Sequence, residues 1–136
     1  MRYCDFYNAE LTCNVGEHDT FAVPFVIKHH VPLQTEEYVF TVRRIVQGQH
    51  RMGKPPVMGD VVFQQIIKYA DLNLIKDSVG DIVGCYFFVV ANKQETANIP
   101  AGINAYDLAI RDITAGMELE LVAPHKFVVG EVLRYE

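Results

Sequence analysis

The stretch Glu95–Asp112, ETANIPAGINAYDLAIRD, says more about the fold than any other part of the chain. A short polar turn leads into Pro100, which presets its own backbone angle, and Gly102, which tolerates a positive φ. Alternate apolar side chains follow, as on one face of a strand: Tyr106, Leu108 and Ile110. The stretch therefore predicts a corner that leads into a strand of an antiparallel β-sandwich.

Short apolar segments separated by turn residues run along the rest of the chain. We expect strands at Asn8–Val15, Thr20–Lys28, Tyr38–Ile45, Val61–Ile67, Ile82–Ala91, Ile103–Arg111, Met117–Val122 and Lys126–Val132, a short strand or turn at Asp71–Lys76, and one helical turn at Asn92–Asn98. Many short strands at regular spacing are typical of a sandwich. The sequence predicts an all-β, immunoglobulin-like antiparallel β-sandwich with one long exposed loop, as a single domain over residues 1–136.

Three of these strands carry more specific expectations. In Thr20–Lys28 the period of two buries Phe21, Val23, Phe25 and Ile27, and Pro24 places the strand at an edge or at a bulge. In Tyr38–Ile45 we expect Tyr38, Phe40 and Val42 to face inward and Thr41 and Arg43 to face out. Ile82–Ala91 is almost continuously apolar, which predicts a central strand buried on both faces.

The composition limits the function classes. The chain has 136 residues, of which 50% are hydrophobic and 21% charged, and a net charge of -5, which argues against nucleic-acid binding. The first twenty residues contain no apolar run of signal-peptide length, and no stretch of the chain approaches the length of a membrane span. The three cysteines show no zinc-ligand spacing, and they are compatible with a protein made in a reducing cytosol. We expect Cys85 to be a buried thiol. Cys4 and Cys13 could form a disulfide only if two strands bring them together.

Residues able to carry chemistry are few. Adjacent residues of a strand point in opposite directions, so His29 and His30 are poorly placed to share a metal ion. The acid pairs Glu36-Glu37 and Glu118-Glu120 are expected on a solvated face, and Ser78 is the one serine of the chain. We predict no enzyme, no catalytic residue, no metal, no cofactor, and no pocket in which reactive groups converge.

Four cations gather at the end of one strand and in the long polar loop Gln47–Gly59: Arg43, Arg44, Arg51 and Lys54. Such a cluster either docks an acidic protein partner or only keeps the loop soluble. We predict these four as protein-binding residues because long loops are often functional. Replacing Arg51 and Lys54 with Glu should then weaken partner binding and leave the melting temperature unchanged.

Several segments resemble the N-terminal immunoglobulin-like domain of phage baseplate upper proteins, found in phages and prophages of Gram-positive bacteria. Gly16–Phe25 is similar to a Gly-x-x-Asp-Thr-Phe turn followed by Pro-Phe, and Tyr38–Arg44 to a Phe-Thr-Val strand with a basic end. Glu95–Gly102 and Tyr106–Leu108 are similar to a Thr-Ala-x-Leu-Pro-Ala-Gly corner and a Tyr-Asp strand. With Lys126–Val129, the resemblance spans most of the chain.

The resemblance implies a structural protein of the virion tail, made in the cytoplasm of the bacterial host. Its partners would be other phage tail or baseplate proteins and copies of itself, without nucleic acid or membrane. Family members continue into receptor-binding parts, whereas this sequence stops at Glu136, so an excised domain and a stand-alone relative both stay open. The alternative function is a carbohydrate-binding or adhesin-type sandwich of the host, although the chain has no Trp for a sugar platform.

Overall fold

The computed structural model describes residues 13–16, 20–47 and 57–130. Its elements, in chain order, are β1 (Cys13–Gly16), β2 (Phe21–Lys28), β3 (Glu36–Gln47), β4 (Val57–Lys68), a 3-10 turn (Tyr69–Asp71), β5 (Asn73–Lys76), β6 (Ile82–Ala91), α1 (Lys93–Ala97), β7 (Gly102–Asp112) and β8 (Met117–Gly130).

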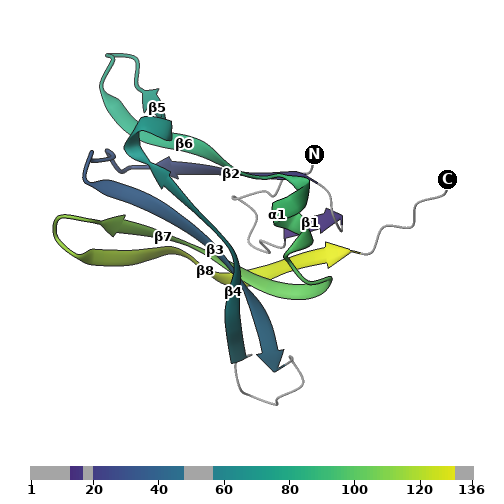
Figure 1. The fold of residues 1–136 in the computed structure, drawn as a ribbon. Helices are drawn as coiled ribbons and strands as arrows, with labels where there is room; N and C mark the ends of the chain where they lie inside the picture. The colour runs from purple at the N-terminus through teal and green to yellow at the C-terminus, as the bar shows by residue number, and fades with distance from the viewer. Residues whose placement is uncertain (1–12, 17–19, 48–56, 131–136) are drawn as a thin grey trace.

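The strands form two sheets that face each other as the layers of a sandwich (Figure 1). One sheet has five strands in the order β1-β8-β7-β3-β4, and the other has three in the order β2-β6-β5. All pairings are antiparallel except that of β1 with β8, which is parallel. The prediction of an all-β sandwich is confirmed.

Aromatic rings from both sheets fill the space between the layers. The largest fully buried side chains include Phe21, Phe25, Tyr38, Phe40, Phe87 and Phe127. Phe40 on β3 lies at the centre, with ring centroids of Phe25 and Tyr106 at 5.8 and 5.5 Å. The alternation along β2, β3 and β7 therefore identifies the inward faces correctly.

The position of β2 explains why a strand can contain Pro24. The strand forms an edge of the three-stranded sheet, where a residue without an N–H costs no ladder hydrogen bond on the open side. Its inward residues Phe21, Val23, Phe25 and Ile27 are all buried, as the sequence predicts.

The corner after β6 forms as expected. Asn92 begins α1 with a capping box, in which its side chain accepts from the Glu95 amide and the Glu95 side chain accepts from the Asn92 amide. Gly102 has a φ of 103°, and the Asn104 side chain donates to the Pro100 carbonyl oxygen at 2.9 Å. These contacts direct the chain into β7, which lies inside the five-stranded sheet.

The prediction that β6 is buried on both faces is wrong. Cys85, Phe87 and Val89 are buried in the sandwich, but Tyr86 and Phe88 point to the other side and are 41% and 45% exposed. The cause is that no element among the described residues covers the outer face of the three-stranded sheet. A continuous apolar run cannot reveal this, because it looks the same whether one face or both are buried.

The segments predicted as Met117–Val122 and Lys126–Val132 are one strand as far as Gly130. β8 runs from Met117 to Gly130 and pairs with β7 along its length, with irregularities between Tyr106 and Ala109. The first irregularity accommodates Ala123 and Pro124, which lie between the two predicted strands, within one continuous strand. Of the predicted strand Asn8–Val15 the structure describes the part in β1, and residues 48–56 of the predicted loop lie outside the described residues. The last residues of that loop, from Val57, belong to β4.

Candidate functional site

The outer face of the three-stranded sheet carries an apolar surface, which we call the outer apolar face. It consists of three cross-strand pairs between β2 and β6: Ala22 with Val90, Pro24 with Phe88, and Val26 with Tyr86, of which Ala22 is itself buried. Tyr86, Phe88 and Val90 remain 41%, 45% and 46% exposed. No charged side chain lies within these three pairs, so neighbouring apolar groups form one continuous patch rather than scattered residues.

The outer face of the five-stranded sheet is mixed instead: one cross-strand row is charged, and the next row is apolar, with Ile66, Val39 and Ala109. Lys68, Glu37, Arg111 and Glu118 occupy matching positions on β4, β3, β7 and β8, so charges alternate in sign across the sheet. Thr41 lies on this face, as predicted, but it is buried and accepts a hydrogen bond of 3.1 Å from the Gln64 side chain. This is the ordinary pattern for a solvated sheet face.

Glu37 departs from the solvated position that the sequence suggests. Its side chain is 7% exposed, and both Nε and Nη2 of Arg111 donate to its Oε1 atom, the first at 2.7 Å. Because β3 lies between β4 and β7, neighbouring side chains cover it on the outer face as well. Glu118 and Glu120, near the sheet edge on β8, are exposed as expected.

A groove of about 460 Å³ opens at one side of the sandwich, between β2 and the β7–β8 hairpin. Its apolar lining comprises Ile27, Ile110, Met117, Leu119 and Leu121, and its polar lining comprises Lys28, His30, Glu36, Asp112 and Glu118. The sequence pattern does not predict this groove. The groove exists because β8 extends its hairpin end past β2, so Met117 and Leu119 are 69% and 64% exposed.

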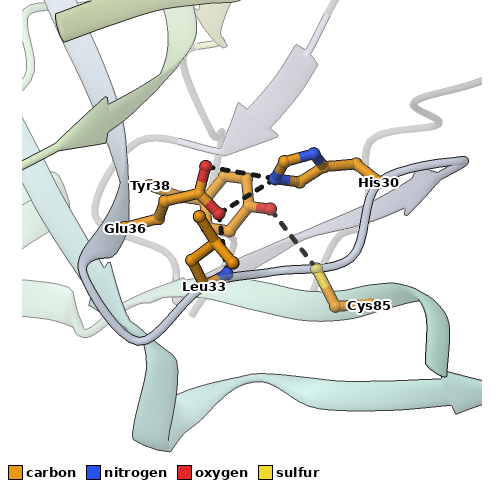
Figure 2. A network of polar contacts seen from close by, with 5 residues as sticks. All are labelled: His30, Leu33, Glu36, Tyr38 and Cys85. Carbon is orange, nitrogen blue, oxygen red and sulfur yellow. Dashed lines mark hydrogen bonds and ion pairs between the residues drawn. The ribbon is translucent and has the colours of Figure 1, made fainter.

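A small polar network lies beside this groove, in the connection from β2 to β3 (Figure 2). Nε2 of His30 is 2.9 and 3.1 Å from the two carboxylate oxygens of Glu36, and the Leu33 amide donates to Oε1 at 2.7 Å. Glu36 is buried, another correction to the solvated acid pair. The carboxylate thus fixes the turn that carries the chain from one sheet to the other.

Cys85 is buried as predicted, and its thiol donates to the hydroxyl oxygen of Tyr38 at 3.6 Å (Figure 2). Burial raises the pKa of the Cys85 thiol, and burial together with the Cys85 contact raises the pKa of Tyr38. Both groups therefore keep their protons at neutral pH. A protonated, buried thiol is a poor nucleophile, so this pair suits packing rather than covalent chemistry.

The described residues bring few reactive groups together. Among them, no group of three or more His, Cys, Asp or Glu side chains could hold a metal ion. His29 is exposed and has a φ of 62°, whereas His30 is committed to Glu36. Nor is any helix in the described part long and apolar enough to cross a membrane.

Of the four predicted protein-binding cations, the structure describes two. Arg43 and Arg44 are exposed on β3, at the last two positions at which β3 pairs with β7. Beyond them β3 and β4 continue as a pair that extends away from the sandwich (Figure 1). The guanidinium of Arg43 donates to the Gly59 carbonyl oxygen at 3.4 Å. Arg51 and Lys54 lie outside the described residues, so the structure does not test whether the four cations gather.

The carboxyl group of Asp107 on β7 is affected by the charges of Arg43 on β3 and of two acidic side chains on β8. Burial raises the pKa of the Asp107 carboxyl group, and the charges of Glu120 and Glu118 raise it further, while Arg43 acts in the opposite direction. The folded protein therefore holds this proton more tightly than the unfolded chain does. Ionising Asp107 costs stability, so the free energy of unfolding should fall as the pH rises from the ordinary value of 3.8 through the raised pKa.

Asp107→Asn should therefore stabilise the protein at neutral pH, because the amide removes the half-buried charge and keeps the shape. Urea unfolding at pH 7 should show a higher midpoint for the variant than for the parent. At a pH below 3.8 the parent carboxyl is protonated in both states, and the difference should vanish. A variant that is less stable at pH 7 would mean that the ionised carboxylate makes a favourable contact instead.

Neither a protein-family model nor a curated protein matches this chain.

The outer apolar face cannot be recognised from the sequence pattern. Its residues look like core residues because β6 is apolar at nearly every position, and the pattern carries no signal that separates a covered face from an open one. The groove cannot be predicted from the sequence for a different reason. Its presence depends on how far β8 extends past the end of β2, and the packing of the two sheets decides this.

Proposed function

We propose that this chain is a non-enzymatic docking module of a phage or prophage tail or baseplate, where it attaches or assembles tail-tip components. The observation that carries this proposal is the outer apolar face, a continuous and partly exposed hydrophobic surface on a protein whose other sheet face carries a row of charged side chains. The tail assignment rests on the resemblance of the segments around Pro24, Phe40 and Pro100 to baseplate upper proteins.

The chemistry of the outer apolar face suits a protein partner. Its most exposed members are an aromatic hydroxyl, an aromatic ring and a branched aliphatic chain, which come from Tyr86, Phe88 and Val90. Aromatic residues without charges are typical of the centre of a protein interface. They lie on neighbouring strands in a fixed register. The side chains of this surface therefore lose little conformational entropy when a partner binds.

The partner is another tail or baseplate protein, and copies of the chain assemble into a homo-oligomer in the virion. Arg43 and Arg44, with Arg51 and Lys54 from the same part of the sequence, add a second contact of basic character. Charges of this kind increase the association rate and set orientation, while the apolar surface supplies most of the affinity.

Tyr86→Lys should weaken binding to isolated phage tails by at least tenfold, because it places a charge in the outer apolar face; a tenfold loss corresponds to about 1.4 kcal/mol. Co-sedimentation at increasing protein concentration measures the affinity. Ile66→Lys is the matched control, since Ile66 is similarly exposed (41%) and lies on β4. Both variants should keep the parent melting temperature within a few degrees.

A loss of binding in Arg51→Glu/Lys54→Glu together with full binding by Tyr86→Lys would move the docking surface to the basic loop. Equal losses in Tyr86→Lys and Ile66→Lys would indicate a general effect of added charge. Either result would contradict the outer apolar face as the main contact.

One observation favours the alternative of a carbohydrate-binding or adhesin-type domain. Tyr86 and Phe88 expose two aromatic rings on one face, and a sugar ring can stack on such a surface. A glycan array separates the two functions: saccharide binding that Tyr86→Ala abolishes would support the alternative, and an array without binding would support the docking module.

A further inference from the structure

The large apolar side chains that are more than half exposed lie together at one end of the sandwich. Their exposed fractions are 51–82%. In the described part of the chain they are Val31 and Leu33 between β2 and β3, Val79 between β5 and β6, and Ile113, Met117 and Leu119 in the β7–β8 hairpin. We call these six side chains the apolar loop end. Exposed apolar residues that gather in this way mark an interaction surface, whereas single ones need no explanation.

The strand register places the three connections at the same end. Lys28 ends β2 and pairs with Gly84 near the start of β6. Glu36 begins β3 and pairs with Asp112 at the end of β7. The β2–β3, β5–β6 and β7–β8 connections therefore point the same way, and Figure 1 shows all three on the left side of the molecule.

The turns at this end do not need apolar side chains to keep their shape. In the β5–β6 hairpin, the Asp77 carboxylate accepts from the amides of Val79 and Asp81, each at 2.9 Å. In the β7–β8 hairpin, the Asp112 carboxylate accepts from the Thr114 amide at 3.0 Å. Such turns are ordinarily completed by polar residues. The apolar side chains at their tips contribute little to the fold, so binding is the better explanation for them.

The groove opens at the same end and provides room for the side chains of a partner. Met117 and Leu119 of the apolar loop end form part of its lining, and Ile27, Ile110 and Leu121 complete the apolar part. Its volume of about 460 Å³ lies within the range of ligand sites, roughly 300–1,000 Å³. An apolar segment can thus bury side chains in the groove and contact the loop tips.

One charge in the lining of the groove is available to a partner. Lys28 already has a partner, and the Asp112 carboxylate accepts from turn amides. His30 and Glu36 pair with each other. The exposed Glu118 side chain forms no hydrogen bond or ion pair with any residue that the structure describes. A basic residue of the occupant would complete this site with a charge-assisted hydrogen bond.

The charges favour a protein segment over a membrane surface. Glu118 lies at the groove, and Asp77 and Asp81 flank Val79, so carboxylates lie next to the apolar tips. Anionic lipids attract basic segments, and they would repel these carboxylates. A protein segment can instead place a single lysine or arginine opposite Glu118.

We propose that the apolar loop end and the groove form a docking surface for an apolar segment of a partner protein that carries a lysine or arginine. The apolar side chains of the segment enter the groove, and its cation pairs with Glu118. This surface shares no residue with the outer apolar face, so one molecule can hold two components at once. The proposal goes beyond the proposed function and does not depend on it.

Selection of a random peptide library on the full chain tests the proposal. We expect the selected peptides to combine several apolar residues with a lysine or arginine. Leu119→Asp should weaken their binding at least tenfold, because it places a charge in the lining of the groove. Fluorescence polarisation of a labelled peptide measures the affinity. Ile103→Asp is the matched control and should bind like the parent, since Ile103 is 46% exposed but lies near the other end of β7.

A charge exchange tests the cation separately. Glu118→Lys should weaken binding of the selected peptide several-fold. The same peptide with its basic residue replaced by glutamate should bind Glu118→Lys more tightly than it binds the parent. Glu120→Lys is the matched control, because it changes the net charge equally at an exposed position that does not line the groove. All variants should keep the parent melting temperature within a few degrees.

Several results would overturn the proposal. Equal binding by the parent and Leu119→Asp would do so, as would a selection that returns no peptide or equal losses in Glu118→Lys and Glu120→Lys. A parent dimer that Leu119→Asp dissociates, seen by light scattering, would assign the surface to a second copy instead. Flotation of the parent but not of Leu119→Asp with vesicles of phosphatidylcholine and phosphatidylglycerol would assign it to a lipid surface.

These experiments use no phage tails, so their outcome is separate from that of the docking experiment with Tyr86→Lys. Peptide binding at the groove can hold while the tail assignment fails, and the reverse is equally distinguishable.

Discussion

Phe40→Ala is expected to lower the free energy of unfolding by about 3–5 kcal/mol. Phe40 is fully buried on β3, the strand between β7 and β4, and its ring meets four others. The ring centroids lie 5.5–6.4 Å away, in Phe25, Phe63, Tyr106 and Phe127. These residues come from four different strands of both sheets, so they cannot collapse together around the cavity that the substitution leaves.

Phe88→Ala is the matched control for this prediction. It removes the same ring from the outer apolar face, where Phe88 is 45% exposed, and should cost clearly less than Phe40→Ala because much less apolar surface is lost from the interior. Urea unfolding followed by circular dichroism measures both. Similar losses for the two variants would mean that the sandwich interior is not packed around Phe40.

The second large effect is expected at the buried charge of Glu37. Arg111→Met should destabilise the protein by about 3 kcal/mol, because it leaves a carboxylate that is 7% exposed without its cation. The Arg111 side chain is 40% exposed, which is why we expect the lower end of the range for breaking a buried ion pair. Methionine keeps most of the aliphatic packing of the arginine stem, so the loss reports the charge.

A double variant separates the loss of the ion pair from the cost of the leftover charge. Glu37→Leu/Arg111→Met removes both charges and should recover most of the stability that Arg111→Met loses. Denaturant midpoints of the parent, the two single variants and the double variant complete the cycle. A double variant as unstable as the sum of the singles would show that the two residues do not interact.

The strands that are predicted well from the sequence are those whose two faces differ in chemistry. In β2 and β7, inward aromatic and aliphatic residues alternate with smaller or polar ones, so the alternation alone assigns Phe25 and Leu108 to the core, where both are buried. The corner after β6 is predicted equally well, because the turn needs a positive φ at Gly102 and glycine adopts this conformation without steric cost. Local sequence suffices wherever a local physical cause decides the conformation.

The sequence is less informative where neighbours decide exposure. Glu36 and Glu37 look like solvated acids, yet His30, the Leu33 amide and Arg111 provide partners that lie up to 74 residues away. In β6 the continuous apolar run does not distinguish the buried face from the exposed one, since Phe87 and Phe88 are chemically identical but lie on opposite sides of the sheet.

By itself the sequence determined the all-β class, most strand positions, the inward faces of the alternating strands and the turn chemistry at Pro100 and Gly102. Tertiary structure alone decided which outer face stays apolar and exposed, which acids are buried, and where β8 overhangs β2 to form the groove. The physical reason is that backbone preference and side-chain alternation act over a few residues, whereas burial is set by what another strand places against a side chain.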